Sequence, residues 1–228
     1  MMKLAVTMVV VVVAMAAAHP STQERFVDNP TTANQVLDNI MERTLEKIVA
    51  LGWDESKKSQ NGKVDIPMHE ESGTTETLEV TQVVITGLGS LTRSKSASFN
   101  ADKTRLTGTI MVENARIAGD YTAQFPGVGE APAQSVQGRV IETVDKLFAD
   151  IVVNLDANLT PQSIRSYEVR SGHDDLTVTG LGDNNQMAPL HEAGFRKAMR
   201  QTLESTMAQN VKVQVNKAIQ DLKAEAAA

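Results

Sequence analysis

The chain has 228 residues, of which 22 are basic and 28 acidic, so its formal net charge at pH 7 is −6. This acidic balance argues against nucleic acid as a partner, because binding a polyanion relies on clustered Lys and Arg side chains, and it also disfavours simple attraction to anionic membranes. The sequence contains no cysteine, so packing has to replace the disulfide bonds that stabilise many exported domains.

The first predicted element is a leader peptide over residues 1–18. Lys3 precedes an apolar run that ends in small residues, and Ala16 and Ala18 have the positions expected for a signal-peptidase site. The run is 15 residues long, whereas a bilayer-spanning helix needs roughly 20. We therefore expect a secreted, extracellular protein with no transmembrane anchor, in which residues 19–228 form a single domain.

Residues 31–51 are predicted to form an amphipathic helix. The apolar residues recur every three or four positions, which aligns them along one helical face. Thr32 and Gln35 have the spacing of a capping box, and Gly52 stands where helices often end in a left-handed residue.

Residues 53–76 are predicted to form a long connection. They carry Asn61-Gly62, Pro67 and several charges without sustained periodicity. A connection of this length in a compact domain either carries function or is mobile. The polar composition favours mobility, so limited proteolysis is expected to cut here first.

Four strands are predicted between residues 78 and 125. Residues 78–85 are β-rich, and residues 91–99 place apolar and polar side chains on opposite faces. Alternation is clearest within 104–125, on both sides of Asn114, which is a common turn residue. We therefore expect an antiparallel hairpin at 104–125 that turns at Asn114, within a four-stranded meander.

Residues 140–155 allow two interpretations. The spacing of the apolar residues over the whole segment is helical, but residues 147–155 also alternate at odd positions. Periodicity therefore does not decide between a helix and a strand. Two short β-rich runs follow, at 163–170 and 176–181.

Residues 187–222 are predicted to form a long final helix, because apolar residues occur at helical intervals over about ten turns. Such a helix in a small domain is either the axis around which other elements pack or a coiled-coil seam. The apolar positions do not keep a strict seven-residue repeat, which favours packing within one domain.

Few residues have the chemistry of catalysis or metal binding. None of the four histidines stands in a recognised nucleophile or metal signature: they are His19, His69, His173 and His191. His173-Asp174-Asp175 lies in a predicted turn, where solvated side chains are a simpler interpretation than a metal or acid–base site. There is also no phosphate-binding glycine loop before a helix. We expect no enzymatic activity, no cofactor and no metal ion.

The order of these elements resembles a known family. The N-terminal helix is followed by a strand that ends at Gly87, by the 104–125 segment, by the run Ser-Tyr-Glu-Val-Arg at 166–170, and by the long helix. Over residues 33–223 the chain resembles the group 7 house dust mite allergens. These arthropod proteins look like one half of the lipid-binding superfamily that contains bactericidal permeability-increasing protein, juvenile hormone-binding proteins and takeout proteins.

The resemblance implies an α+β fold in which curved antiparallel sheets, about two of four strands each, form a super-roll around the C-terminal helix, with the N-terminal helix beside it. It also favours a strand for residues 140–155. It further implies a non-enzymatic protein that binds an apolar ligand, such as a lipid or fatty acid, between sheet and helices. The lack of cysteine matches the mite proteins and departs from the disulfide-bearing hormone carriers, so the carriers' pocket is not transferred to this chain.

An apolar ligand would contact side chains that face the gap between sheet and helices. The candidate ligand-binding residues come from both predicted helices and from the strands: Leu37, Ile40, Met41, Val83, Ile85, Ile110, Val112, Ile117, Tyr121, Phe125, Met199, Leu203 and Met207. Methionine favours an adaptable cavity, because its flexible thioether fills irregular space. The alternative for each residue is ordinary core packing, which such stripes mainly reflect. For the whole protein, the alternative is an extracellular interaction or structural module with a packed core and no ligand.

Overall fold

The structure is a computed structural model that describes residues 30–58, 62–69, 74–125, 134–180 and 188–228. The predicted leader lies outside these residues. The helical segments, in chain order, are α1 (Ala33–Ala50), the 3-10 turn η2 (Leu88–Ser90), α2 (Ala188–Ser205), the π-helical segment η3 (Thr206–Val211) and α3 (Lys212–Ala226). The strands are β1 (Lys57–Lys58), β2 (Gly62–His69), β3 (Thr74–Thr86), β4 (Thr92–Arg93), β5 (Ser98–Phe99), β6 (Arg105–Phe125), β7 (Gln134–Leu155), β8 (Pro161–Ser171) and β9 (Asp174–Thr179).

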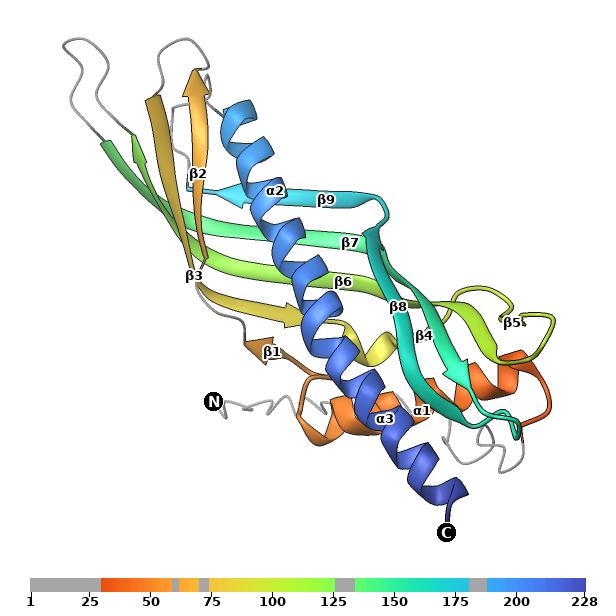
Figure 1. Cartoon of the computed structure of the whole chain (residues 1–228). Coiled ribbons are helices and arrows are strands. Elements are labelled where there is room, and N and C mark those ends of the chain that lie inside the picture. Colours follow the sequence, from red (N-terminus) through yellow and green to blue (C-terminus); the bar gives the residue numbers. More distant parts are fainter. Residues whose placement is uncertain (1–29, 59–61, 70–73, 126–133, 181–187) are drawn as a thin grey trace, which may run out of the picture.

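The fold is α+β, as expected: one antiparallel sheet curves beside the long C-terminal helix, and α1 lies at one end of that helix (Figure 1). The long strands β6 and β7 pair along their whole length and belong to both halves of the sheet. In one half they are flanked by β3, with β2 beyond it, and by β9. In the other half they are flanked by β4 and β5 and by β8. The two expected sheets of about four strands are thus joined through β6 and β7.

The junction between the two halves runs through Asn114 of β6 and Asp145 of β7. The register pairs Glu113 with Lys146 and then Ala115 with Val144, so the strands stay in step while each skips one residue. Asn114 has a positive φ of 51°. Because one residue in each strand leaves the alternation, the buried positions change from even to odd numbers in chain order along both β6 and β7. The same face of the sheet therefore stays buried through the junction.

The predicted hairpin at 104–125 is wrong, because β6 is a single strand through that segment. Asn114 has the left-handed backbone that a turn would use. However, β7 continues alongside on both sides of it, so the chain kinks and does not reverse. Gly87 explains part of this geometry: a Cβ there would lie 2.9 Å from the Asn114 carbonyl oxygen. The backbone at Gly87 therefore lies directly against the backbone of Asn114, where β6 kinks.

Two further local predictions are corrected. Residues 53–76 are not one long connection, because they include β1, β2 and the start of β3. Backbone pairing with β3 makes β2 a strand despite its polar sequence, and the ladder includes Pro67 opposite Thr75. Residues 91–99 form only the two-residue strands β4 and β5. Between them, the Ala97 N–H donates a hydrogen bond of 2.8 Å to the Asn34 side-chain oxygen of α1.

The remaining elements confirm the sequence analysis. α1 begins at a capping box in which the Thr32 hydroxyl accepts from the Gln35 N–H at 3.2 Å and the Gln35 side chain accepts from the Thr32 N–H at 3.1 Å. Residues 140–155 lie in β7, as the family resemblance implied and against the helical spacing. The long C-terminal helix is present from Ala188 to Ala226. Among the described residues, no helix combines the length and apolar character needed to cross a membrane.

Candidate functional site

The long C-terminal helix has two ends with different surroundings. α3 packs against α1 and β8, whereas α2 packs against β2, β6, β7, β8 and β9 (Figure 1). Ion pairs tie α3 to α1: Arg43 lies 2.8 Å from Glu225, and Lys47 pairs with Asp221. The π-helical segment Thr206–Val211 separates these two parts. π-Helical segments occur frequently at functional sites, because the inserted residue interrupts the regular hydrogen-bond ladder.

The contact between α2 and the sheet is partly apolar. The rings of Tyr121 on β6 and Phe195 on α2 meet edge to face with their centroids 4.5 Å apart. Met199 and Leu203 continue the buried side of the helix, and each is 1% exposed. The Tyr121 hydroxyl donates a hydrogen bond of 2.9 Å to the Thr179 carbonyl oxygen of β9. Phe195, Met199 and Leu203 of α2, together with Tyr121 of β6, thus form the apolar part of this interface.

Charged residues lie beside this apolar contact. Asp174, at the start of β9, pairs with both Arg196 and Arg200 of α2. Its side chain is only 7% exposed, so water screens these pairs weakly. Nearby, the Ser171 hydroxyl donates a hydrogen bond of 2.7 Å to Glu204. α2 is therefore attached to the sheet by ion pairs as well as by apolar packing.

Glu142 is the most unusual member of this charged cluster. It lies on β7, opposite Ile117 of β6 and Leu176 of β9, and its side chain is fully buried. Among the described residues, neither carboxylate oxygen has a hydrogen-bond partner, and neither does the Nε–H of Arg200, which lies 4.0 Å from Glu142 Oε1. Burial raises the pKa of Glu142 to about 7, against the opposing attraction of Arg200 and Arg196. A buried polar group without a partner commonly marks a water or ligand position.

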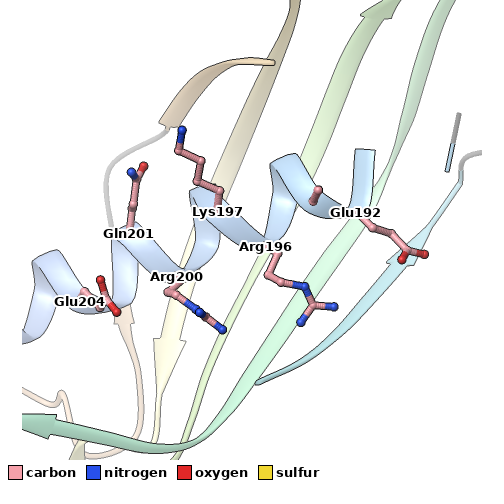
Figure 2. Close-up of a pocket in the computed structure, with 7 residues that line it drawn as sticks. Glu192, Arg196, Lys197, Arg200, Gln201 and Glu204 are labelled. Atoms are coloured by element: carbon pink, nitrogen blue, oxygen red, sulfur yellow. The ribbon is translucent and has the colours of Figure 1, made fainter. Parts of the chain in front are cut away.

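A groove of about 480 Å³ lies along α2 above this cluster (Figure 2). Figure 2 shows Arg196 and Arg200 pointing toward the strands, while Lys197 and Gln201 extend from the other side of the helix. The groove is lined by Glu192, Ala193, Arg196, Lys197, Arg200, Gln201 and Glu204. Arg200, which lies 4.0 Å from Glu142, is one of the lining residues, whereas Glu142 itself is not.

Two other pockets involve described residues. One, of about 710 Å³, lies where the start of α1, the turn between β7 and β8 and the end of α3 meet, and its lining includes Thr31, Asn158 and Glu225. The other, of about 320 Å³, lies over β3, β6 and β7 and includes Val83. Among the described residues, neither pocket is lined by a buried polar atom that lacks a hydrogen bond, whereas the α2 groove is lined by Arg200, whose Nε–H lacks one, so the α2 groove is the stronger candidate site.

Twelve of the thirteen candidate ligand-binding residues belong to one buried apolar cluster: Leu37, Ile40, Met41, Val83, Ile85, Ile110, Val112, Ile117, Tyr121, Met199, Leu203 and Met207. The side chain of the thirteenth, Phe125, lies outside the described part. Of the twelve, only Val83 lines any of the three pockets above. The structure thus brings these residues together as core, and their role as ligand contacts stays a prediction.

The sequence analysis did not identify the charged cluster. Glu142 stands between Ile141 and Thr143 in a run otherwise rich in β-branched residues, and a lone acid in such a run was an available signal. Asp174 was interpreted as solvated, but it is buried and paired, whereas His173 and Asp175 are exposed. Among the residues described, no group of His, Asp and Glu side chains has the arrangement of a metal site.

Comparison with known proteins gives distant structural likenesses alone. No family model and no curated protein matches the chain. Among solved structures, it is similar to takeout 1 of Epiphyas postvittana, with a TM-score of 0.37 and 13% identity over 75% of this chain and 78% of that one. It is also similar to lipopolysaccharide binding protein, with a TM-score of 0.38 and 12% identity over 81% of this chain and 40% of that one. The chain therefore spans less than half the length of the second protein. The finer resemblance to group 7 mite allergens stays a prediction.

Proposed function

We propose that this protein is a secreted, non-enzymatic carrier that holds an apolar ligand between α2 and the curved sheet. The observation that carries the proposal is the division of the long helix at Thr206–Val211. On one side of this π-helical segment, α3 is fixed to α1 by apolar contacts and ion pairs. On the other side, α2 packs on the first half of the sheet, not on a helix, through Phe195 and Met199 and through the ion pairs of Asp174 with Arg196 and Arg200.

This asymmetry suits a binding protein whose core opens at one end. Moving α2 away from the sheet would uncover the apolar side chains of β6 and β7 while α3 and α1 keep the other half packed. Met199 and Met207 lie in the buried face on either side of the start of the π-helical segment. Unbranched thioether side chains adapt to irregular space more readily than branched ones. A ligand tail inserted there would gain about 0.8 kcal/mol for each methylene that it buries.

Uptake of a neutral fluorescent apolar probe, together with extraction of lipid from the purified protein, tests this function. We expect saturable uptake that strengthens with ligand chain length. Met199→Phe puts a larger apolar side chain at a position of α2 that is 1% exposed, so less room is left for a ligand there. It should weaken probe binding by about tenfold, or about 1.4 kcal/mol, with a melting temperature near that of the parent.

The matched control is Val213→Phe, because Val213 is 47% exposed on α3. This variant should bind the probe as the parent does. If the parent protein takes up no probe and carries no extractable lipid, the carrier function is wrong, and the packed interaction module of the sequence analysis takes its place.

A further inference from the structure

The turn between β7 and β8 carries the run Asn158-Leu159-Thr160. Asn-x-Thr is the acceptor sequence for an N-linked glycan in exported proteins, unless the middle residue is proline. The other asparagine with a Ser or Thr two residues later is Asn29, and Pro30 stands between them. Asn158 is therefore the single acceptor position in the sequence.

Asp156 holds this turn together. One of its carboxylate oxygens accepts hydrogen bonds from the Asn158 N–H and the Thr160 N–H, both at 2.9 Å, and its own N–H donates to the Thr160 carbonyl oxygen at 3.1 Å. Within the described part of the chain, no hydrogen bond of the turn uses the Asn158 amide group or the Thr160 hydroxyl. Asn158 is also exposed. A glycan can therefore be attached to it without breaking a hydrogen bond of the turn.

Asn158 also lines the pocket of about 710 Å³ that lies between the start of α1, this turn and the end of α3, hereafter the end pocket. Its volume is within the range of small-molecule sites. Its wall combines apolar residues such as Leu222 with neutral polar residues such as Thr160. Glu225, the charged residue of the described wall, is paired with Arg43 at 2.8 Å. This lining suits a sugar, which is uncharged and presents both hydroxyl groups and C–H faces.

We propose that Asn158 carries an N-linked glycan whose innermost N-acetylglucosamine lies in the end pocket. The inference rests on the proposed secretion, because the glycan donor, a polyprenyl diphosphate oligosaccharide, belongs to the export pathway. The Asn158 amide nitrogen forms a bond to C1 of the sugar, the bond from C1 to the diphosphate breaks, and the nitrogen gives up one proton. Pro161 follows the acceptor run and restricts Thr160 to extended backbone. We expect this restriction to slow the transfer, so that a glycosylated and an unmodified form are secreted together.

Expression of the full-length sequence in cultured eukaryotic cells tests the attachment. Peptide mass analysis of the secreted protein should place a glycan on Asn158. Asn158→Gln and Thr160→Ala should each abolish it, whereas Thr160→Ser keeps the hydroxyl and should retain it. Secreted protein without any glycan overturns the attachment and leaves the proposed secretion standing. Parent protein that stays inside the cell overturns the secretion, and the glycan with it.

Thermal unfolding tests where the sugar lies. An endoglycosidase trims a high-mannose glycan to one N-acetylglucosamine, and this form should melt about 2–4 °C above Asn158→Gln, the shift expected from one stabilising contact in a domain of this size. The control moves the acceptor: Asp102→Asn, combined with Asn158→Gln, creates one ahead of Lys103-Thr104 in the exposed turn before β6. The same single sugar there should leave the melting temperature unchanged. No rise for the sugar at position 158, or an equal rise at both positions, overturns its place in the end pocket.

Discussion

Replacing Glu142 with glutamine should stabilise the protein, and by an amount that depends on pH. The side chain is fully buried, and burial raises its pKa from the ordinary 4.5 to about 7 although Arg200 and Arg196 favour the charged form. A neutral amide of nearly the same shape does not need to lose the hydration of a charge. The variant therefore removes a destabilising ionisation and keeps the packing.

The sign and size of the effect follow from the two pKa values. Below pH 4.5 the carboxyl group is protonated in both the folded and the unfolded chain, so ionisation contributes nothing. As pH rises from 4.5 to about 7, the unfolded chain ionises first and the folded protein loses stability. At 1.36 kcal/mol for each pKa unit, the loss reaches about 3 kcal/mol above pH 7.

Urea unfolding of the parent and Glu142→Gln across this pH range measures the effect. The variant should have nearly the parent's free energy of unfolding below about pH 4.5 and exceed it by about 3 kcal/mol above about pH 8. Other carboxyl groups titrate in both proteins and cancel in the difference. Glu168→Gln, an exposed control on β8, should have a free energy of unfolding close to that of the parent. A difference for Glu142→Gln that does not grow with pH would refute the reasoning.

Two further predictions concern α2 and the sheet beneath it. The sequence has no cysteine, so a single introduced cysteine reports local opening without background labelling. Ala198 on α2 and Ala218 on α3 are both buried. We expect faster thiol labelling in Ala198→Cys than in Ala218→Cys, and slower labelling at position 198 when the neutral apolar probe is bound. Gly138→Ala should destabilise the fold by at least about 2 kcal/mol, since its Cβ would clash with the Thr179 carbonyl oxygen. Gly52→Ala, with a φ of +67° but open space around the new Cβ, should cost only about 1 kcal/mol of backbone strain in urea unfolding.

The helices were largely predictable from the sequence, because their signals are local. The capping box at Thr32 and Gln35 fixes where α1 begins, and both side chains lie within one turn. The apolar spacing of residues 187–222 predicted the long helix for the same reason. The π-helical segment at Thr206–Val211 was not predicted. An inserted residue rotates the following part of the helix by about 100°, and helical intervals read from sequence alone do not locate such an insertion.

The strands were predictable in type but not in connection. Alternation on either side of Asn114 correctly indicated two extended segments with a change of phase between them. A change of phase is compatible with both a turn and a kink. Only the partner strand β7, paired on both sides of the break, makes it a kink. Residues 140–155 lie in β7 itself. They are extended because the neighbouring strands β6, β8 and β9 supply backbone hydrogen-bond partners, which apolar spacing in the sequence does not reveal.

The apolar residues of the candidate site were predictable from the sequence, but its charged cluster was not. The sequence alone determined which side chains are apolar and share a face, and the structure gathers twelve of those predicted residues into one core. It could not place Glu142 near Arg200, because the two residues lie on different elements with no local pattern that relates them. Their approach depends on how α2 crosses β7 and on the pairing of Asp174 with both arginines. Local periodicity determines the faces of helices and strands, whereas tertiary packing decides which faces meet and which charged groups are buried together between them.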